Sequence, residues 1–324
     1  MITEFVCDAC EFPSIGLVMT NDAIIGHTGF VGGALVHQHP FGATYNSSNI
    51  DAIAQTTFDT VVCAAAPGSM FIANRHPEHD RAAIEALVDQ LSKVRARRFV
   101  LVSSIAVLAD FAGGADERTT AFQEEFAYGH HRRLLEAFCE GHFDHCMVVR
   151  LPALFGPGLR KNFLFDLMNP VPSMLPEARL KPFLDQIEPA LRDALADSYA
   201  LDAVTGVFCL NRAKLNADAR RPALDAAVRA AGVSATQFHH PDSTYQYYDM
   251  TRLWQDIETV FDAGLNCIHL AVAPSRAADI HAHLLGTDMP ETGAKLHHED
   301  MRTCHAGQWG CEGPYLEDAT TVLF

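Results

Sequence analysis

The sequence predicts an α/β protein whose core is a doubly wound parallel sheet, carrying a smaller, mostly C-terminal substrate-binding region. Two observations predict this class. Short apolar runs alternate with amphipathic stretches through the first half of the 324-residue chain, and a glycine-rich turn follows the first apolar run. Strands that alternate with helices favour a parallel sheet with helices on both faces, because a parallel pair needs a crossover connection.

The elements follow in a regular order until the middle of the chain. The predicted strands are 23–25, 60–65, 98–104, 146–151 and 267–271, and the predicted helices are 31–36, 80–94, 128–138 and 275–285. Between 160 and 200 several prolines separate helical pieces, which is typical of a small domain or lid carried on a sheet, and the tail 286–324 is irregular. We therefore expect an N-terminal extension over 1–21, a dinucleotide-binding domain over 22–159 and 245–287, and a substrate-binding region over 160–244 and 288–324.

Charge and composition exclude several classes of function. Lys plus Arg number 24 against 40 Asp plus Glu, a formal charge of −16, and such a surface repels nucleic-acid phosphates and anionic lipid. The chain has no apolar run of about 18 residues and opens without a basic leader, so we expect a cytoplasmic protein with no membrane partner. The nine cysteines are an odd number in mostly apolar surroundings, which predicts reduced thiols.

The glycine-rich turn has the spacing Gly26-x-x-Gly29-x-x-Gly32 between a predicted strand and helix. Glycines at such a turn let the backbone approach a pyrophosphate at the helix N-terminus. The turn therefore predicts a Rossmann-like site for NAD or NADP, although a tight strand-to-helix turn without a ligand has the same pattern. The residues expected to contact the cofactor here are Gly26, Thr28, Gly29, Phe30, Val31 and Gly32.

The choice between NAD and NADP is normally made about 20 residues after the first glycine, by an acidic residue or an arginine. Residues 44–49 contain neither, so the choice stays open. Asn46 and Ser47 are the expected ribose or 2′-phosphate contacts. Ala64, Ala65 and Ala66 end the second buried strand and are small enough for the cofactor to lie against them, but helix-to-sheet packing demands small residues too.

Three further segments follow the glycine turn in a characteristic order: Ser103-Ser104 at a strand end, Tyr128 with Arg132 four residues later, and an Arg-x-x-x-x-x-Gly-Pro-Gly run over 150–158. Together they resemble the extended short-chain dehydrogenase/reductase family, in its NAD-dependent epimerase/dehydratase branch. The resemblance implies that Ser104, Tyr128 and Arg132 are catalytic. It also implies cofactor contacts, which are Ser103, Tyr128, Arg132, Leu151 and Pro152.

The implied activity is that of an NAD(P)-dependent oxidoreductase or epimerase acting on a carbonyl or secondary alcohol of a small molecule, with a nucleotide sugar as the implied substrate. Tyr128 is the expected acid or base, and Ser104 the group that steadies the developing oxyanion. The family has Lys where this chain has Arg132, and a guanidinium is bulkier and does not lose its proton. Two alternatives therefore stay open: a non-catalytic NAD(P)-binding regulator on the same fold, with Tyr128 a partly buried aromatic, and a structural partner protein that binds no nucleotide.

Substrate contacts are expected in the second region. Asn162 follows the Gly-Pro-Gly turn, Arg160 and Lys161 add local positive charge suited to an anionic substrate, and Gln246 lies in an alternating aromatic run that predicts either a pocket wall or a half-buried strand. Alternatively, the two cations are solvated charges on a loop. A homodimer through the helix of Tyr128 is one arrangement that the resemblance implies.

The cysteines near the two ends of the chain are candidate ligands for a zinc site. Cys7 and Cys10 have the C-x-x-C spacing, and Cys304, His305 and Cys311 near the other end are the remaining candidate ligands. Only one pair has standard spacing, so we predict reduced cysteines and no metal.

Overall fold

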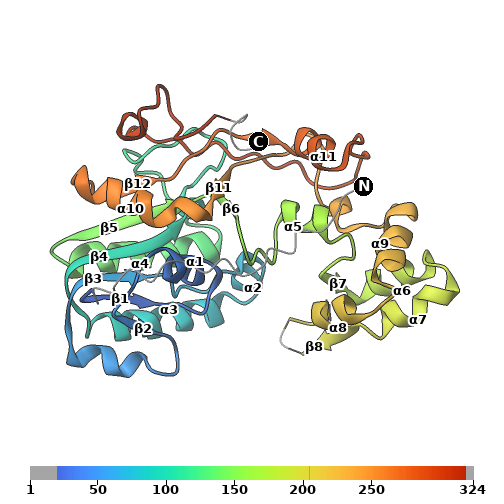
Figure 1. The fold of residues 1–324 in the computed structure, drawn as a ribbon, viewed down its shortest axis with the longest axis horizontal. Coiled ribbons are helices and arrows are strands. Elements are labelled where there is room, and N and C mark those ends of the chain that lie inside the picture. Colours follow the sequence, from blue (N-terminus) through green and yellow to red (C-terminus); the bar gives the residue numbers. More distant parts are fainter. Residues whose placement is uncertain (1–19, 204, 319–324) are drawn as a thin grey trace, which may run out of the picture.

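The computed structural model describes residues 20–203 and 205–318. Its centre is a six-stranded, fully parallel sheet in the order β2-β1-β3-β4-β5-β12 (Figure 1). The strands are β1 (Asp22–Ile25), β2 (Ala43–Tyr45), β3 (Thr57–Cys63), β4 (Arg95–Ser104), β5 (Cys146–Leu151) and β12 (Cys267–His269). The predicted Rossmann-like class is confirmed.

Helices cover both faces of the sheet, and each face has its own apolar core. On one face Leu35 of α1 (Phe30–Gln38) and Ile257 of α10 (Leu253–Asp262) pack against the strands. On the other, Ile84 of α3 (Pro77–Leu91) and Leu135 of α4 (Ala127–His142) do the same. All residues of β5 are buried, as expected for a strand covered on both faces. The short α2 (Met70–Arg75) precedes α3.

The strand order creates a switch point beside β1. The chain leaves β1 for β2 on one side and then returns to place β3 on the other side. In open α/β sheets, ligands bind outside the carboxyl ends of the strands where the order reverses. The glycine turn after β1 and residues 64–68 after β3 border this crevice.

A smaller lobe with its own core follows the sheet (right of Figure 1). It contains an antiparallel sheet in the order β7-β9-β8 and a core that includes Phe183, Leu195 and Leu224. Pro189 begins one of its helices, where a missing N–H costs nothing. Its elements are α5 (Phe163–Met168), β7 (Met174–Pro176), α6 (Glu177–Asp185), α7 (Pro189–Ala196), β8 (Tyr199–Asp202), β9 (Val207–Leu210), α8 (Arg212–Ala217) and α9 (Arg221–Ala230).

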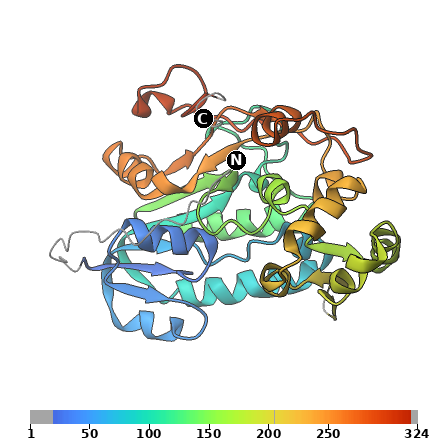
Figure 2. The same cartoon turned by 45° about the vertical axis from the view of Figure 1, so that its right-hand side comes forward.

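Short elements connect the lobe to the sheet. The strands are β6 (Ala153–Phe155), β10 (Thr244–Tyr245), β11 (Tyr247–Asp249) and β13 (Ser275–Arg276), followed by α11 (Ala277–Leu285). The 3-10 helices among the described residues are η1 (Ile50–Gln55), η2 (Ile105–Val107), η3 (Ala235–Phe238), η4 (Met250–Arg252) and η5 (Ala306–Trp309). In the second view the lobe and α11 border the same side of the molecule (Figure 2).

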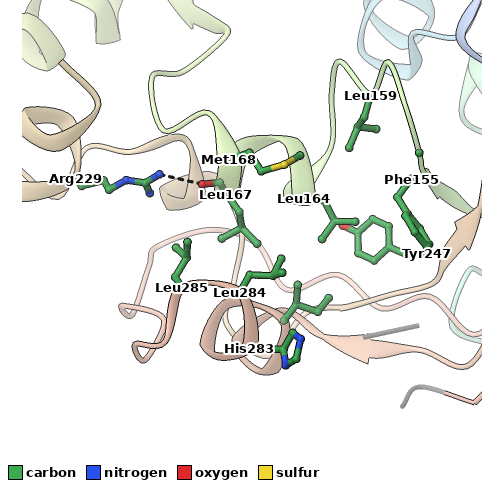
Figure 3. Close-up of a pocket in the computed structure, with 12 residues that line it drawn as sticks. Phe155, Leu159, Leu164, Leu167, Met168, Arg229, Tyr247, His283, Leu284 and Leu285 are labelled. Atoms are coloured by element: carbon green, nitrogen blue, oxygen red, sulfur yellow. Dashed lines mark hydrogen bonds between the residues drawn. The ribbon is translucent and has the colours of Figure 1, made fainter. Parts of the chain in front are cut away.

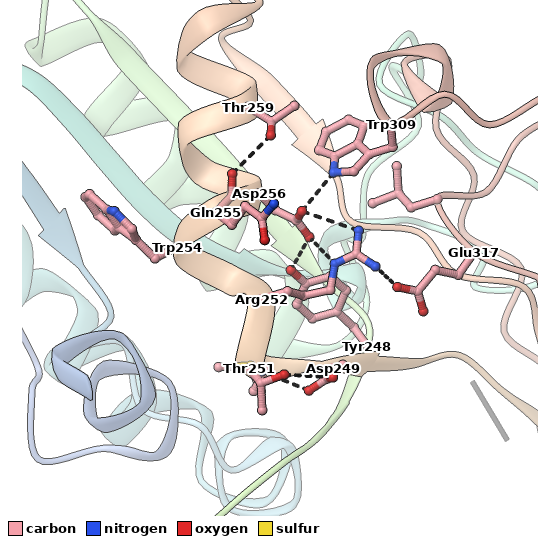
Figure 4. Close-up of polar contacts among 12 residues, drawn as sticks. Tyr248, Asp249, Thr251, Arg252, Trp254, Gln255, Asp256, Thr259, Trp309 and Glu317 are labelled. Carbon is pink, nitrogen blue, oxygen red and sulfur yellow. Dashed lines mark hydrogen bonds and ion pairs between the residues drawn. The ribbon is translucent and has the colours of Figure 1, made fainter. Parts of the chain in front are cut away.

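The C-terminal segment corrects one predicted domain boundary. Residues 288–324 were expected in the substrate-binding region, but Leu316 packs in the sheet's core and its N–H donates to Ala271 O at 2.8 Å. Asp256 of α10 holds the same segment, because its carboxylate accepts a hydrogen bond from Trp309 Nε1 at 2.8 Å (Figure 4). The same carboxylate accepts from Tyr248 Oη at 2.5 Å. Arg252 joins the cluster and pairs with Glu317. The described end of the chain therefore packs with the six-stranded sheet and its helices.

Candidate active site

The three glycines of the turn have different roles: Gly26 and Gly32 allow close backbone packing, whereas Gly29 has free space where a side chain would be. A Cβ on Gly26, whose φ is 92°, would lie 2.6 Å from Ala64 O, and one on Gly32 would lie 2.1 Å from Gly26 O. Gly29 has an ordinary φ of −79°, and an added Cβ would meet only Gly26 O, at 3.4 Å. No side chain caps the helix that follows, so the amides of its first turn are not taken up by a capping side chain.

The other predicted cofactor residues lie around this turn. Thr28, Phe30 and Val31 belong to the turn and the first turn of α1, and Ala64–Ala66 form the neighbouring wall after β3. Asn46 and Ser47 follow β2 directly. The Asn46 side-chain oxygen accepts from Ser48 N at 2.9 Å and Ser48 Oγ at 2.6 Å, so it shapes a local turn. Nothing in this turn selects between NAD and NADP.

Tyr128 and Ser104 meet at the carboxyl end of β4. A Cβ on Gly129 would lie 1.9 Å from Ala106 O, so α4 packs backbone-close against η2 and brings the preceding Tyr128 beside the strand end. There the Tyr128 phenol lies near the Ser104 hydroxyl. Burial raises the pKa of Tyr128, and the Arg132 charge and the nearby Ser104 hydroxyl oppose this without cancelling it. The phenol is therefore protonated at neutral pH and suited to donate a proton.

Arg132 lies against the Tyr128 ring, and its guanidinium forms an ion pair with Asp80. Its Cζ is 3.9 Å from the ring centroid. Its two terminal nitrogens donate to the Asp80 carboxylate at 2.5 and 2.9 Å, a bidentate pair with both side chains buried. They also donate to the carbonyls of Tyr128, at 3.2 Å, and Pro67. Arg132 therefore keeps its charge near the phenol, while Asp80 balances it.

Asp80 is the site residue that sequence reasoning missed. It was expected to begin a helix, and its partner lies 52 positions away, a separation at which no periodicity signals a contact. His131 Nδ1 lies 2.8 Å from the same carboxylate. Burial alone would raise the pKa of Asp80, but the hydrogen bonds of Arg132 and His131 outweigh burial, so its pKa is lowered.

Replacing Asp80 with Asn is expected to lower the free energy of unfolding at pH 7 by about 3 kcal/mol, because it leaves the buried Arg132 charge uncompensated. A carboxyl whose pKa is lowered on folding stabilises the fold above its unfolded pKa of about 3.9, and this stabilisation is lost as the pH falls through the folded value. The difference in the free energy of unfolding between wild type and Asp80→Asn should therefore become smaller below about pH 4. Urea unfolding at pH 7 and in acid measures this, with exposed Asp89→Asn on the same helix as the control. Equal stabilities of the two variants at pH 7 would show that the pair is not needed.

Two predicted contacts are corrected by the structure. Ser103 Oγ, expected to contact the cofactor, instead donates to Glu136 Oε1 at 2.5 Å, because successive residues of a strand face opposite sides. That carboxylate also pairs with Arg150 at 2.7 Å. Gln246, expected to contact substrate, is fully buried, and its amide bonds Val272 O at 2.6 Å and both backbone groups of Met301 at 2.7 Å. It anchors the C-terminal segment instead.

The segment 156–162 crosses from the lobe to the crevice. A Cβ on Gly158 would lie 3.9 Å from the Phe30 ring, so this segment passes the glycine turn. Asn162 begins α5 by accepting from Phe165 N at 3.1 Å, and it donates to Leu154 O at 2.7 Å. Arg160 is exposed. At the end of β5, buried Leu151 lies beside Ser104, and Pro152 follows.

A cavity of about 530 Å³ opens beyond this segment, between α5 and α11 (Figure 3). Leu164, Leu167 and Met168 line it from α5, and Leu284 and Leu285 face them from α11. Phe155 and Tyr247 close the end of the cavity nearest the sheet. Arg229 and His283 also line the cavity, and they are its charged and titratable side chains. The cavity is mostly apolar and adjoins the loop where substrate contacts are expected.

The candidate metal ligands are divided. Cys7 and Cys10 lie outside the described residues. Ligand atoms of Cys304, His305 and Glu117 lie within 4.8 Å of one another. Glu117, however, accepts from His269 N and Thr303 Oγ1, both at 2.7 Å, and from Cys304 N at 2.9 Å. Through these bonds Glu117 connects the strand end at His269 to residues 303–304. The absence of a bound metal remains a prediction. The cysteines in the described ranges are free thiols.

Comparison with known proteins supports the family resemblance. Residues 39–178 match the model of the NAD dependent epimerase/dehydratase family, which confirms the resemblance for that part of the chain. No curated protein sequence is significantly similar to this chain. Among the described residues, no helix is both long and apolar enough to span a membrane.

Three solved structures with low sequence identity share the fold. A dTDP-4-dehydrorhamnose reductase from Bacillus anthracis in complex with NADP has a TM-score of 0.58 at 11% identity, covering 92% of this chain and 95% of its own. A UDP-galactose 4-epimerase has a TM-score of 0.55 at 13% identity, covering 89% and 92%. MoeE5 in complex with UDP-glucose and NAD has a TM-score of 0.52 at 14% identity, covering 91% and 92%.

Proposed function

We propose that this protein is an NAD(P)-dependent oxidoreductase or epimerase that acts on a carbonyl or secondary alcohol of a nucleotide sugar. The observation that carries the proposal is the position of the Tyr128 phenol, which lies near the Ser104 hydroxyl at the carboxyl end of β4, with the Arg132 guanidinium against its ring. The family match over 39–178 and the nucleotide-sugar enzymes among the similar folds support the substrate class.

The residues present fit a dinucleotide. Gly29 leaves room for close backbone approach, the first turn of α1 has no side-chain cap, and small residues follow β3. Gly26, Gly29 and Gly32 would hold the pyrophosphate, with Asn46 and Ser47 at the adenosine ribose. NAD or NADP, when bound, supplies hydride donation or acceptance at its nicotinamide.

The chain's own residues handle the proton and the substrate oxygen. In the reduction direction, Tyr128 Oη donates its proton to the carbonyl oxygen as that oxygen becomes an alkoxide, and the Ser104 hydroxyl donates a hydrogen bond to it. The raised pKa of Tyr128 favours this direction, because the proton is present at neutral pH. The Arg132 charge beside the ring stabilises the tyrosinate left behind.

A panel of nucleotide sugars with NADH and NADPH tests the proposal. Nicotinamide absorbance follows net reduction or oxidation, and product analysis with NAD or NADP detects epimerisation without net redox change. We expect turnover of at least one nucleotide sugar. Tight dinucleotide binding without turnover of any carbonyl or alcohol substrate would instead favour the non-catalytic regulator.

The proposed setting of this activity is the cytoplasm, and the proposed assembly is a homodimer through α4. Free thiols in the described chain support the compartment. Leu134 on α4 is 46% exposed and Phe126 at its start 56% exposed, which supports an apolar contact surface there. Sedimentation of the purified protein measures the subunit number.

A further inference from the structure

Two cations lie at the same end of the crevice. Arg132 donates to the carbonyl of Pro67, and Lys161 Nζ donates to the carbonyl of Gly68, the next residue. The two acceptor carbonyls belong to consecutive residues, so both side chains bind the same short segment of the chain. Consistent with this, burial lowers the pKa of Lys161, and the Arg132 charge lowers it further.

Arg132 has no hydrogen left for a ligand. A guanidinium has five N–H donors. Its four terminal ones are matched by two contacts to Asp80 and by the carbonyls of Tyr128 and Pro67. The fifth, on Nε, has no protein partner but is enclosed by protein. As placed, the Arg132 guanidinium therefore offers a bound dinucleotide no hydrogen bond.

The Lys161 ammonium, in contrast, has three donors and one protein acceptor, Gly68 O. Its position is enforced by the next residue. Asn162 has φ 106° and ψ 178°, a region used almost only by glycine, and it is the one non-glycine residue with positive φ in the described ranges. Such strain costs about 1–3 kcal/mol and persists where the surroundings enforce it. Here the bonds of Asn162 to Leu154 O and Phe165 N enforce it.

The location of Gly68 indicates which part of a ligand Lys161 meets. Residue 64 packs on the glycine turn, and residue 67 contacts Arg132 beneath Tyr128. Residues 64–68 therefore run from the pyrophosphate end of the crevice toward the catalytic tyrosine, a path of at most about 14 Å. Lys161 lies at the far end of this path.

We propose that Lys161, rather than Arg132, supplies the cation that contacts the nicotinamide-ribose half of the bound dinucleotide. Its two remaining N–H donors bond hydroxyl oxygens of that ribose. Arg132 then acts only on Tyr128. This inference rests on the proposed function, since it presupposes that the crevice binds NAD or NADP.

Binding of whole and truncated nucleotides tests the inference. Calorimetric titrations with NADH, NADPH and ADP, which lacks the nicotinamide half, are carried out on wild type, Lys161→Met and Lys161→Arg. Lys161→Met should weaken binding of the preferred dinucleotide about tenfold or more, the loss expected for one charge-assisted hydrogen bond, and leave ADP within about twofold. Lys161→Arg, which keeps the charge, should lose less. The control is Lys181→Met, an exposed lysine on α6, which should change neither affinity.

Each other outcome overturns the inference. Equal losses for the dinucleotide and ADP would show that Lys161 only shapes the crevice. Unchanged dinucleotide affinity with a raised KM for substrate would place Lys161 on the substrate. Failure of the proposed function is distinguishable, because wild-type protein itself would then bind neither NADH nor NADPH.

Discussion

Replacing Tyr128 with phenylalanine is expected to lower kcat for carbonyl reduction by about 10²-fold or more, because it removes the proton donor while keeping the ring that stacks on Arg132. Cofactor affinity should fall only modestly. Steady-state kinetics on a substrate found by screening measures this. Tyr315→Phe is the matched control, since it removes a phenol that bonds Asp300 on the C-terminal segment. Full turnover by Tyr128→Phe would show that another group, such as His131 or a bound water, is the acid.

The pH dependence of the same reaction follows from the raised pKa of Tyr128. Because the acid form does the work, reduction should be independent of Tyr128 ionisation through neutral pH, and its rate should fall only as the phenol ionises above about pH 10. This alkaline limb should be absent from the residual activity of Tyr128→Phe. A tyrosine-dependent limb near neutral pH would contradict the assignment of a protonated donor.

The second large effect is expected at the glycine turn. Gly29→Leu should weaken NAD(P)H binding by about 100-fold or more, because a side chain there fills the space through which the backbone approaches the pyrophosphate. The fold should survive, since Gly29 has a negative φ and a Cβ there meets nothing closer than 3.4 Å. Fluorescence titration with NADH and NADPH measures the loss, and thermal melting checks the fold.

Gly33→Ala is the matched control, because a Cβ at that position in the same helix lies 3.6 Å from His27 O, an ordinary contact. It should leave affinity unchanged. Gly26→Ala and Gly32→Ala should instead destabilise the protein, since their Cβ atoms would collide with backbone. Wild-type affinity in a folded Gly29→Leu protein would remove the pyrophosphate assignment.

Local patterns predicted the parts of the site that lie near one another in the sequence. The apolar runs before and after the glycine turn fix β1 and α1, because a buried parallel strand must be apolar on both faces. The placement of Tyr128 and Arg132 on one face follows from their spacing of four on a helix. Their contact, with a guanidinium 3.9 Å from the ring, is what that spacing allows.

Contacts between distant segments were not predictable in the same way. Asp80 and Arg132 come from different helices, and either charge alone has the pattern of a solvated helix face. The Gln246 side chain lies in an aromatic run typical of a pocket wall, but its partners Val272 and Met301 are 26 and 55 positions away. The irregular tail gave no periodicity to show that Leu316 packs in the core of the sheet.

Native mass spectrometry of the intact protein, with and without added NADH and NADPH, tests the central claim most directly. The claim is that the crevice after β1 and β3 binds a nicotinamide dinucleotide. It predicts an added mass of one dinucleotide per chain in wild type and Gly33→Ala, and no such addition in Gly29→Leu. Folded wild-type protein that takes up neither dinucleotide would contradict it.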